Sequence, residues 1–307
     1  MKIFTGLKKL KARQFPRPVA AIGIFDGVHV GHQRVFKKAI AAARRIGGTA
    51  LAVTFNPHPQ RVLDMIKAPP LLVSLEHRIK LIEREGLDVL IVLDFNEKMA
   101  RYSAADFIEK ILVSKIGAAA VVIGADFTFG RDRKGDILLL RSFGDRYGFT
   151  VRAVPLLAIG GEPVSSTRIR GYILSGALRS AQRLFGRPVS VMGTVVRGSR
   201  RGRLLGYPTA NIDPHHEVIP PEGVYAVYIL RGGKRHKGVL NIGTRPTFEK
   251  GVPPTIEVHI VNFDKHIYGT DIEVIFVKRL REERRFARRE DLIRQIGIDE
   301  RAAAMVL

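Results

Sequence analysis

Two histidines separated by Val30 and Gly31 form the segment His29–His32, and their type and spacing suit phosphate chemistry. An imidazole N–H can donate a hydrogen bond to a phosphoryl oxygen, and donors aimed at charge that develops in a transition state are often the largest catalytic contribution. Gly27 and Gly31 let the backbone pass close to a ligand. Taken alone, the same residues would also suit a tight turn with two surface histidines.

The histidine pair lies between a predicted strand and a predicted helix. The apolar run over 19–24 is short enough for a buried strand. Apolar residues then recur at helical spacing from Val35 to Ala43, before Gly47 and Gly48 end the helix. A helix N-terminus presents unpaired N–H groups and a partial positive charge. Phosphate binding is therefore the favoured interpretation of the two histidines.

The strand-then-helix pattern continues to about residue 154. Further strands are predicted over 49–55, 89–93, 120–123 and 149–154, and helices over 75–85, 103–114 and 137–147. The prolines of Asn56-Pro57-His58-Pro59 argue against helix there. This alternation predicts an α/β domain, a parallel sheet with helices on both faces. Ligands bind such sheets beyond the carboxyl ends of the strands, which is where we expect His29, His32, Asn56, His58 and Asp126.

The loop over 124–135 has the composition of a site for a flat ligand. Phe127 and Phe129 stand beside Asp126 and Arg131. The aromatic rings can sandwich a planar ring while the charged groups hold its polar edge. The alternative is that both rings pack into a small core.

The segment over 164–170 leads hydroxyl groups into a predicted helix. Ser166 and Thr167 stand one turn before Arg170. Hydroxyls, helix N–H groups and a guanidinium together can hold a pyrophosphate. An N-capped helix without a ligand would have the same residues.

From about residue 185, closely spaced strand patterns with Gly and Pro turns predict a small antiparallel β-barrel. The strands are expected over 189–196, 224–230, 237–242, 255–262 and 271–277, and a charged helix follows from about residue 288 to the C-terminus. We therefore expect two domains, 1–184 and 185–307.

Two segments of this second half can do chemistry. Thr209 and Asn211 offer a hydroxyl and an amide oxygen two residues apart, and both can reach a hard cation such as Mg²⁺. Period-two alternation over 255–260 puts Glu257 and His259 on the polar face of a strand. A carboxylate there can be a general base for a hydroxyl, although a solvent-facing Glu is the commoner case. The basic loop over 197–203 can cover phosphates or be a solvated loop.

Composition narrows the function classes. The 307 residues include no cysteine, which excludes disulfides, thiolate metal sites and thiol nucleophiles. No apolar run is long enough to span a bilayer, and the basic N-terminus lacks a signal core, so a cytoplasmic location is expected. The net charge of +22 can steer anionic ligands or bind nucleic acid. Nucleic acid is the less favoured partner, because aromatic–basic interleaving and zinc-finger ligands are absent.

Four motifs of the first half carry a family resemblance: Gly23-x-Phe-Asp-Gly-x-His-x-Gly-His32, Thr54-Phe-Asn-Pro-His-Pro59, Gly124-x-Asp-Phe-x-Phe-Gly130 and Ser165-Ser-Thr-x-Ile-Arg170. Together they resemble the adenylyltransferase half of the bacterial bifunctional riboflavin kinase/FAD synthetases, which belong to the H-x-G-H nucleotidyltransferases. The resemblance implies a Rossmann-like domain that transfers AMP from ATP to FMN and releases pyrophosphate.

The resemblance also implies roles for individual residues. His29 and His32 would contact the ATP phosphates, and the β- and γ-phosphates would be held by Ser166, Thr167 and Arg170. The residues placed near the flavin are Asn56, Asp126, Phe127, Phe129 and Arg131. The ligand-binding set further includes Gly23, Phe25, Asp26, Gly31 and His58.

Motifs of the second half resemble the riboflavin kinase domain of the same family: Pro208-Thr-Ala-Asn211, the segment 238–247, Glu257-Val-His259, Tyr268-Gly269 and the segment 279–286. The resemblance implies that Thr209 and Asn211 bind Mg-ATP, and the ligand-binding set of this half further includes Gly206 and Pro208. It implies that Glu257 is the base on the riboflavin 5′-hydroxyl.

The prediction is therefore an enzyme that phosphorylates riboflavin to FMN in its barrel and adenylylates FMN to FAD in its N-terminal domain. Mg²⁺ would arrive with ATP. One alternative is an adenylyltransferase for another phosphate acceptor, with a non-catalytic barrel. Another is an RNA-binding protein that uses the positive charge. The sequence leaves the oligomeric state open.

Overall fold

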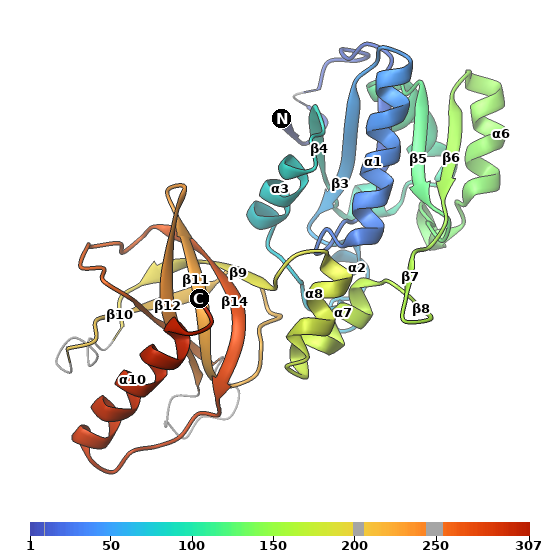
Figure 1. The fold of residues 1–307 in the computed structure, drawn as a ribbon. Coiled ribbons are helices and arrows are strands. Elements are labelled where there is room, and N and C mark those ends of the chain that lie inside the picture. The colour runs from blue at the N-terminus through green and yellow to red at the C-terminus, as the bar shows by residue number, and fades with distance from the viewer. Residues whose placement is uncertain (9, 199–205, 244–253) are drawn as a thin grey trace. The chain divides into compact units, whose positions relative to one another are not determined.

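The computed structural model describes residues 1–8, 10–198, 206–243 and 254–307. The chain divides into two units, one formed by residues 1–70 and 75–166 and the other by residues 71–74 and 167–307 (Figure 1). Each unit has its own sheet.

The first unit is built on a parallel sheet of six strands, as the alternation of strands and helices predicts. The strands are β1 (Lys2–Thr5), β2 (Val19–Ile22), β3 (Ala50–Asn56), β4 (Val89–Asp94), β5 (Ala120–Gly124) and β6 (Thr150–Val154). Their order in the sheet is β1-β4-β3-β2-β5-β6, and every pairing is parallel. The chain therefore runs outward from β2 in one direction, through β3 and β4, and then returns to the other side of β2 with β5.

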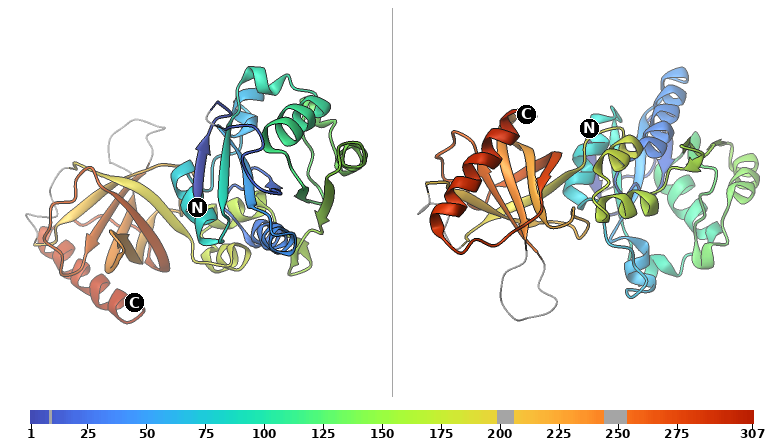
Figure 2. Two further views of the ribbon diagram at one scale, coloured as in Figure 1. Left: turned by 90° about the horizontal axis from the view of Figure 1, so that it is seen from above. Right: turned by 60° about the horizontal axis from the view of Figure 1, so that its bottom comes forward.

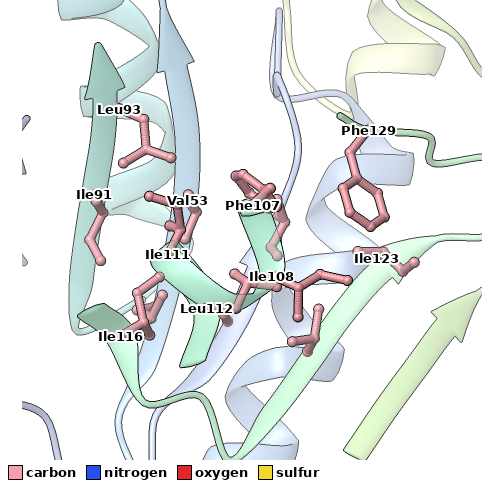
Figure 3. Close-up of a cluster of buried hydrophobic side chains, with 14 of the residues drawn as sticks. Val53, Ile91, Leu93, Phe107, Ile108, Ile111, Leu112, Ile116, Ile123 and Phe129 are labelled. Carbon is pink, nitrogen blue, oxygen red and sulfur yellow. The ribbon is translucent and has the colours of Figure 1, made fainter. Parts of the chain in front are cut away.

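Helices cover both faces of this sheet. The longer ones are α1 (Val30–Arg45), α3 (Leu75–Arg84), the π-helix η1 (Phe107–Ile116) and α6 (Ile137–Tyr147). Alternate residues of β3, Leu51, Val53 and Phe55, belong to the hydrophobic cluster that buried residues of η1 also join. Figure 3 shows Val53 in this cluster together with Ile111 and Leu112 of η1. Helix α1 packs against β2, β3 and β5 with residues outside that cluster. The four inner strands β2, β3, β4 and β5 are buried on both faces, which is why they read as continuous apolar runs.

Short elements complete this unit: α2 (Pro59–Leu63), α4 (Glu97–Ala100), α5 (Ala104–Asp106), the 3₁₀ turn η2 (Arg131–Arg133), and the ribbon β7 (Ala158–Ile159) with β8 (Glu162–Pro163). The expectation of no helix over 56–59 needs a correction, because α2 begins at Pro59. Proline is tolerated in the first turn of a helix, where its missing N–H would have had no intrahelical partner.

The second unit contains a closed antiparallel barrel, as predicted. Its strands are β9 (Ser190–Val196), β10 (Thr209–Pro214), β11 (Gly223–Arg231), β12 (Lys234–Gly243), β13 (Thr255–Ile260) and β14 (Asp271–Arg281), in the order β10-β13-β12-β11-β14-β9. Helix α10 (Arg289–Ala304) packs against β11, β12 and β14 (Figure 2). Two further helices, α7 (Ser166–Leu174) and α8 (Leu178–Phe185), precede the barrel. Among all the helices described here, none has the length and apolar character needed to cross a membrane.

Candidate active sites

The histidine pair lies at the start of α1. His29 is the N-cap of this helix, in extended backbone conformation, and its Nδ1 accepts a hydrogen bond from the backbone N–H of His32 at 3.3 Å. A ring nitrogen that accepts carries no proton, so the neutral imidazole of His29 holds its proton on Nε2. The cap therefore leaves His29 with an N–H donor at the opposite end of the ring from the helix backbone.

The two imidazoles stack on each other. Their ring centroids are 3.5 Å apart and the planes differ by 18°. His32 also meets the edge of Phe25, whose ring is buried and packs against Phe36. A Cβ added to Gly23 would come 2.7 Å from the Phe25 ring, so this glycine makes room for the aromatic support under His32. The spacing of His29 and His32 thus lets the two imidazole rings stack, and the buried ring of Phe25 supports the stack from the apolar core.

The loop that leads to the histidines is anchored by Arg78, which sequence reasoning missed. This side chain of α3 is buried and donates to the carbonyl oxygens of Ile24 at 2.7 Å and Phe55 at 3.1 Å. Burial lowers the pKa of Arg78, while the nearby carboxylates of Asp26 and Glu76 raise it. One guanidinium therefore holds together the backbone that follows β2 and the end of β3.

Asp26 and Ser166 connect the histidine loop to the start of α7. Asp26 is buried, and its carbonyl oxygen accepts a hydrogen bond from the Ser166 hydroxyl at 3.0 Å. Farther along the helix, Thr167 is exposed and Arg170 is buried. The hydroxyl of Ser166 thus contacts the histidine loop. Binding of a pyrophosphate by Ser166, Thr167 and Arg170 together stays a prediction.

The topology places the 124–135 loop next to the histidine loop. Strands β2 and β5 are neighbours, and the order of strands reverses between them. Loops that follow such a pair form the usual ligand crevice of an open α/β sheet. Asp126 and Arg131 are exposed in this loop. The two charged side chains are thus exposed in a loop that follows the strand next to the one that leads to the histidines.

The two aromatics of this loop differ in exposure. Phe129 is only 7% exposed and packs against Phe107 in the core, whereas Phe127 is partly buried and stacks on Phe129 with centroids 5.7 Å apart. The sandwich of a planar ring between the two side chains is thus corrected for Phe129, which packs into the core as the alternative has it, while Phe127 stays partly accessible. Its backbone bonds to Gly135 in both directions, which closes the loop and turns its ring inward.

Asn56 and His58 follow β3, as predicted. Asn56 is exposed, and its peptide bond to Pro57 is cis. His58 is the N-cap of α2, and its Nδ1 accepts from the N–H of Gln60 at 3.2 Å. His58 therefore has the same tautomer as His29, with its proton on Nε2.

A row of polar residues crosses three strands of the barrel. Glu257 of β13 lies directly opposite Asn211 of β10 on one side and opposite Asn241 of β12 on the other. Directly opposed residues of an antiparallel pair have side chains on the same face and close together. The alternation predicted for β13 is confirmed, because Ile256, Val258 and Ile260 are buried inside the barrel and Glu257 is half-buried on the polar face.

Thr209 stands on the same face of β10 as Asn211, two residues earlier. Its opposite residue is His259, whose Nδ1 lies 2.9 Å from the carbonyl oxygen of Pro208 and whose ring meets the ring of Tyr207 edge-on. Gly206, with φ of +83°, turns the chain into this segment. His259 and Tyr207 thus fix the turn that presents the Thr209 hydroxyl.

The donors on this face fit a hard cation. The hydroxyl of Thr209, the amide oxygen of Asn211 and the carboxylate of Glu257 are the oxygen types that Mg²⁺ prefers. The Asn211 amide lies over Gly198, where any Cβ would overlap it, so the backbone there leaves space for this side chain. In the described ranges there is no group of three or more His, Cys, Asp or Glu side chains placed to hold a metal.

A pocket of about 170 Å³ adjoins this turn. It is lined by Pro208, Thr209, Val258, Ile260 and the segment 263–268. Its walls are largely the apolar interior of the barrel mouth, with Asp264, Lys265 and His266 at the loop. The pocket thus gives Thr209 an adjoining cavity with both apolar and charged walls. The basic loop predicted over 197–203 and the end of the 238–247 motif lie largely outside the described residues.

Comparisons with known proteins match each half of the chain separately. The model of the FAD synthetase family matches residues 11–168, and the model of the riboflavin kinase family matches residues 185–307. A bifunctional riboflavin kinase/FMN adenylyltransferase of Escherichia coli (strain K12) is 36% identical over 304 residues, which cover 99% of this chain and 97% of that protein. Its counterpart in Bacillus subtilis (strain 168) is 38% identical over 292 residues, 94% of this chain and 92% of that one.

A solved structure has the same fold over nearly the full length. It is described as a macrolide-efflux protein from Streptococcus pneumoniae, and it superposes with a TM-score of 0.84 at 30% identity, covering 99% of both chains.

Proposed function

This chain belongs to the family of bifunctional riboflavin kinase/FMN adenylyltransferases, and from that premise we propose which residues perform its two reactions. The enzyme phosphorylates riboflavin to FMN and adenylylates FMN to FAD, and it uses ATP in both steps. The supporting observation is that the residues suited to each reaction fall in different units, His29 and His32 in the first and Glu257 in the barrel.

We propose that the histidine loop of the first unit binds the ATP phosphates. A phosphate oxygen of FMN attacks the α-phosphorus of ATP, the bond to the bridging oxygen breaks, and pyrophosphate leaves. The FMN phosphate is already anionic at neutral pH, so no strong base is needed. The Nε2–H of His29 and the N-terminus of α1 are donors suited to the negative charge that spreads over the phosphoryl oxygens.

The flavin is proposed to lie between the loops that follow β3 and β5. Asn56 and Asp126 are exposed there, and Phe127 presents the accessible ring of the aromatic pair. A flat ring can stack on Phe127, while Phe129 supports it from the core. Arg131, in the loop after β5, and His58, in the loop after β3, are the further polar residues proposed for this site.

In the barrel, Glu257 is proposed to accept the proton of the riboflavin 5′-hydroxyl. The hydroxyl oxygen attacks the γ-phosphorus of ATP, the bond between the β- and γ-phosphates breaks at the bridging oxygen, and ADP leaves. Such transfer depends mainly on positioning and charge neutralisation. The polar row supports this role because Glu257 is flanked by two amide side chains, Asn211 and Asn241.

Mg²⁺ is proposed to be held by the hydroxyl of Thr209 and the amide oxygen of Asn211, together with the phosphates. When bound, the ion would neutralise charge on the β- and γ-phosphates. The pocket beside Thr209 would take the nucleoside base. Substituting Asn211 by Leu, which has no oxygen ligand, would raise the Mg²⁺ concentration needed for half-maximal FMN formation.

The alternative of a non-catalytic barrel has no support, since the riboflavin kinase model matches the barrel itself. The domain boundary at 184/185 and the cytoplasmic location stay predictions. Limited proteolysis with mass spectrometry tests the first, and fractionation of cells tests the second.

The direct test of the two activities is a time course of products. Purified protein is incubated with riboflavin, Mg²⁺ and ATP, and flavins are separated by chromatography. We expect FMN to appear first and FAD to follow. Accumulation of FMN without FAD would contradict the adenylyltransferase assignment, and unchanged riboflavin would contradict the kinase assignment.

A further inference from the structure

The polar face of the barrel has a second carboxylate near Glu257. Glu283 follows the end of β14, and its Oε1 accepts a hydrogen bond from the Nδ2 of Asn241 at 3.2 Å. A Cβ added to Gly243 would overlap the Glu283 carboxylate. The side chain of Glu283 therefore lies over β12, on the strand face that bears Asn241, and glycine at 243 is what leaves it room.

This contact fixes which way the Asn241 amide is turned. A carboxylate only accepts hydrogen bonds, so the amide must present its nitrogen to Glu283. The Oδ1 of Asn241 then lies on the other side of the amide carbon from that nitrogen. Asn241 is also directly opposite Glu257 across β12 and β13. The arrangement supplies a hydrogen-bond acceptor of fixed orientation beside the residue assigned as general base.

We propose that Asn241 positions the phosphoryl acceptor through its Oδ1, and that Glu283 is a positioning residue that sets the orientation of Asn241. The inference rests on the proposed role of the barrel as riboflavin kinase. The acceptor alcohol there ends a polyol chain, and a neighbouring hydroxyl of that chain donates to Oδ1. Two contacts to one flexible chain hold its terminal oxygen beside Glu257, which lowers the entropy cost of reaching the reactive geometry.

The test compares five variants in steady-state kinetics of FMN formation. Asn241→Ala removes the amide, Glu283→Ala removes its orienting carboxylate, and Glu283→Gln keeps an acceptor oxygen. The double variant of the two alanine changes reports their coupling. Glu282→Gln is the matched control, because Glu282 is the exposed neighbour with only a 4.0 Å ion pair to Arg279 described for its carboxylate. Thermal unfolding followed by circular dichroism shows for each preparation that the barrel is folded, and FAD formation from supplied FMN shows that the first unit is intact.

We expect Asn241→Ala to lower kcat/KM for riboflavin by about 10–100-fold, the range of one lost substrate hydrogen bond, with KM for ATP unchanged within about twofold. Glu283→Ala should lower it by about 5–10-fold, and Glu283→Gln should recover most of that loss. The double variant should be no worse than Asn241→Ala, because the two residues act through one amide. Glu282→Gln should behave as wild type.

Riboflavin analogues that each lack one ribityl hydroxyl give a second readout. In the wild type, removing the hydroxyl that contacts Asn241 should cost about as much as the Asn241→Ala change, and the same analogue should lose nothing further in that variant.

Three results would overturn the proposal. They are riboflavin kcat/KM within twofold of wild type in Asn241→Ala, a change confined to KM for ATP, or additive losses in the double variant. Failure of the kinase assignment gives a different result, because the wild type itself would then form no FMN. Failure of the Asn241 proposal would leave FMN formation by the wild type intact and unchanged in the variants.

Discussion

The imidazole of His29 lies directly against the backbone of Gly31. A Cβ built on Gly31 would come 3.0 Å from Cε1 and 3.1 Å from Nδ1 of that ring, tighter than ordinary carbon contacts. A side chain at residue 31 would therefore push the His29 ring a few tenths of an ångström from its stacked position on His32.

Gly31→Ala should therefore separate stability from activity. Alanine favours a helix interior over glycine by about 0.5–1 kcal/mol, and this gain offsets the weaker cap that a displaced His29 ring gives, so the stability should change by less than about 1 kcal/mol. Displacement of the His29 ring by a few tenths of an ångström should lower FAD formation by about tenfold. Urea denaturation and FMN adenylylation measure the two effects. Gly297→Ala, in α10, is the matched helical control, because its new Cβ would meet nothing closer than 3.5 Å.

His32→Ala should stop the second reaction and spare the first. Loss of one donor to a developing phosphoryl charge typically costs about 10²–10³ in rate. FMN formation should stay within about twofold, because His32 belongs to the first unit and the barrel to the second. Separate assays with riboflavin and with FMN as substrates measure both. Loss of both activities in a folded variant would be incompatible with two sites.

Glu257→Gln should do the reverse. Removing a general base should reduce FMN formation by about 10²–10⁴. FAD formation from supplied FMN should be unchanged. Glu222→Gln removes an exposed carboxylate of the same unit and serves as control. Near-normal FMN formation by Glu257→Gln would show that another group takes the proton.

Arg78→Met should weaken the first unit and its reaction together. Methionine keeps much of the buried volume but leaves the carbonyls of Ile24 and Phe55 without their charged donor. A buried hydrogen bond to a charged group contributes about 1.5–3 kcal/mol, so we expect a loss of that order or more. Arg84→Met, exposed on the same helix, should have little effect. If thermal unfolding of Arg78→Met matched wild type, the anchoring role would be wrong.

The carboxylate of Asp106, at the start of the Phe107–Ile116 helix, should make the stability of the fold depend on pH. Hydrogen bonds from Lys110 and Ser103 lower the pKa of Asp106 from 3.8 to about 2. A carboxylate with a lowered folded-state pKa stabilises the fold above its unfolded pKa, and this contribution is lost as the pH falls through the folded value.

The difference in urea midpoint between wild type and Asp106→Asn should accordingly be largest above pH 4 and shrink toward pH 2. Asp145→Asn, at an exposed position of α6, should show no such trend. A difference that grew with acidification would contradict the assigned sign.

Elements with strong periodicity and clear ends were predictable from sequence alone. The helix over 137–147 has the bounds expected, and it ends at a glycine in left-handed conformation, Gly148. The capping box at Ser103 forms with Asp106 in place of the usual Glu or Gln, because the shorter carboxylate still reaches the Ser103 N–H.

The missed elements lacked such signals. Strand β1 has four residues at the edge of the sheet and little buried surface, so its pattern is too short to read. Strand β10 carries Asn211, Asp213 and Pro214, which have low strand propensity, and its place is set by pairing with β9 and β13.

The same distinction holds for the sites. The histidine pair stood out because the type and spacing of its residues are unusual, and Glu257 was singled out by the alternation of its strand together with the family resemblance. Arg78 reads in sequence as an ordinary charged residue of an amphipathic helix, and only the fold shows that it points inward. The sequence does not single out Asn241, because its proposed role depends on the β12–β13 register, which places it opposite Glu257, and on its hydrogen bond to Glu283, 42 positions away.

His29 and His58 share one more property, since each caps a helix through the lone pair of Nδ1. Each ring is therefore held by the first turn of the helix that it begins, with the edge that carries Nε2 turned away from that turn. Substituting either histidine would remove a helix cap and an N–H donor in one step, so the cost to the fold and the cost to ligand binding fall together at these two positions.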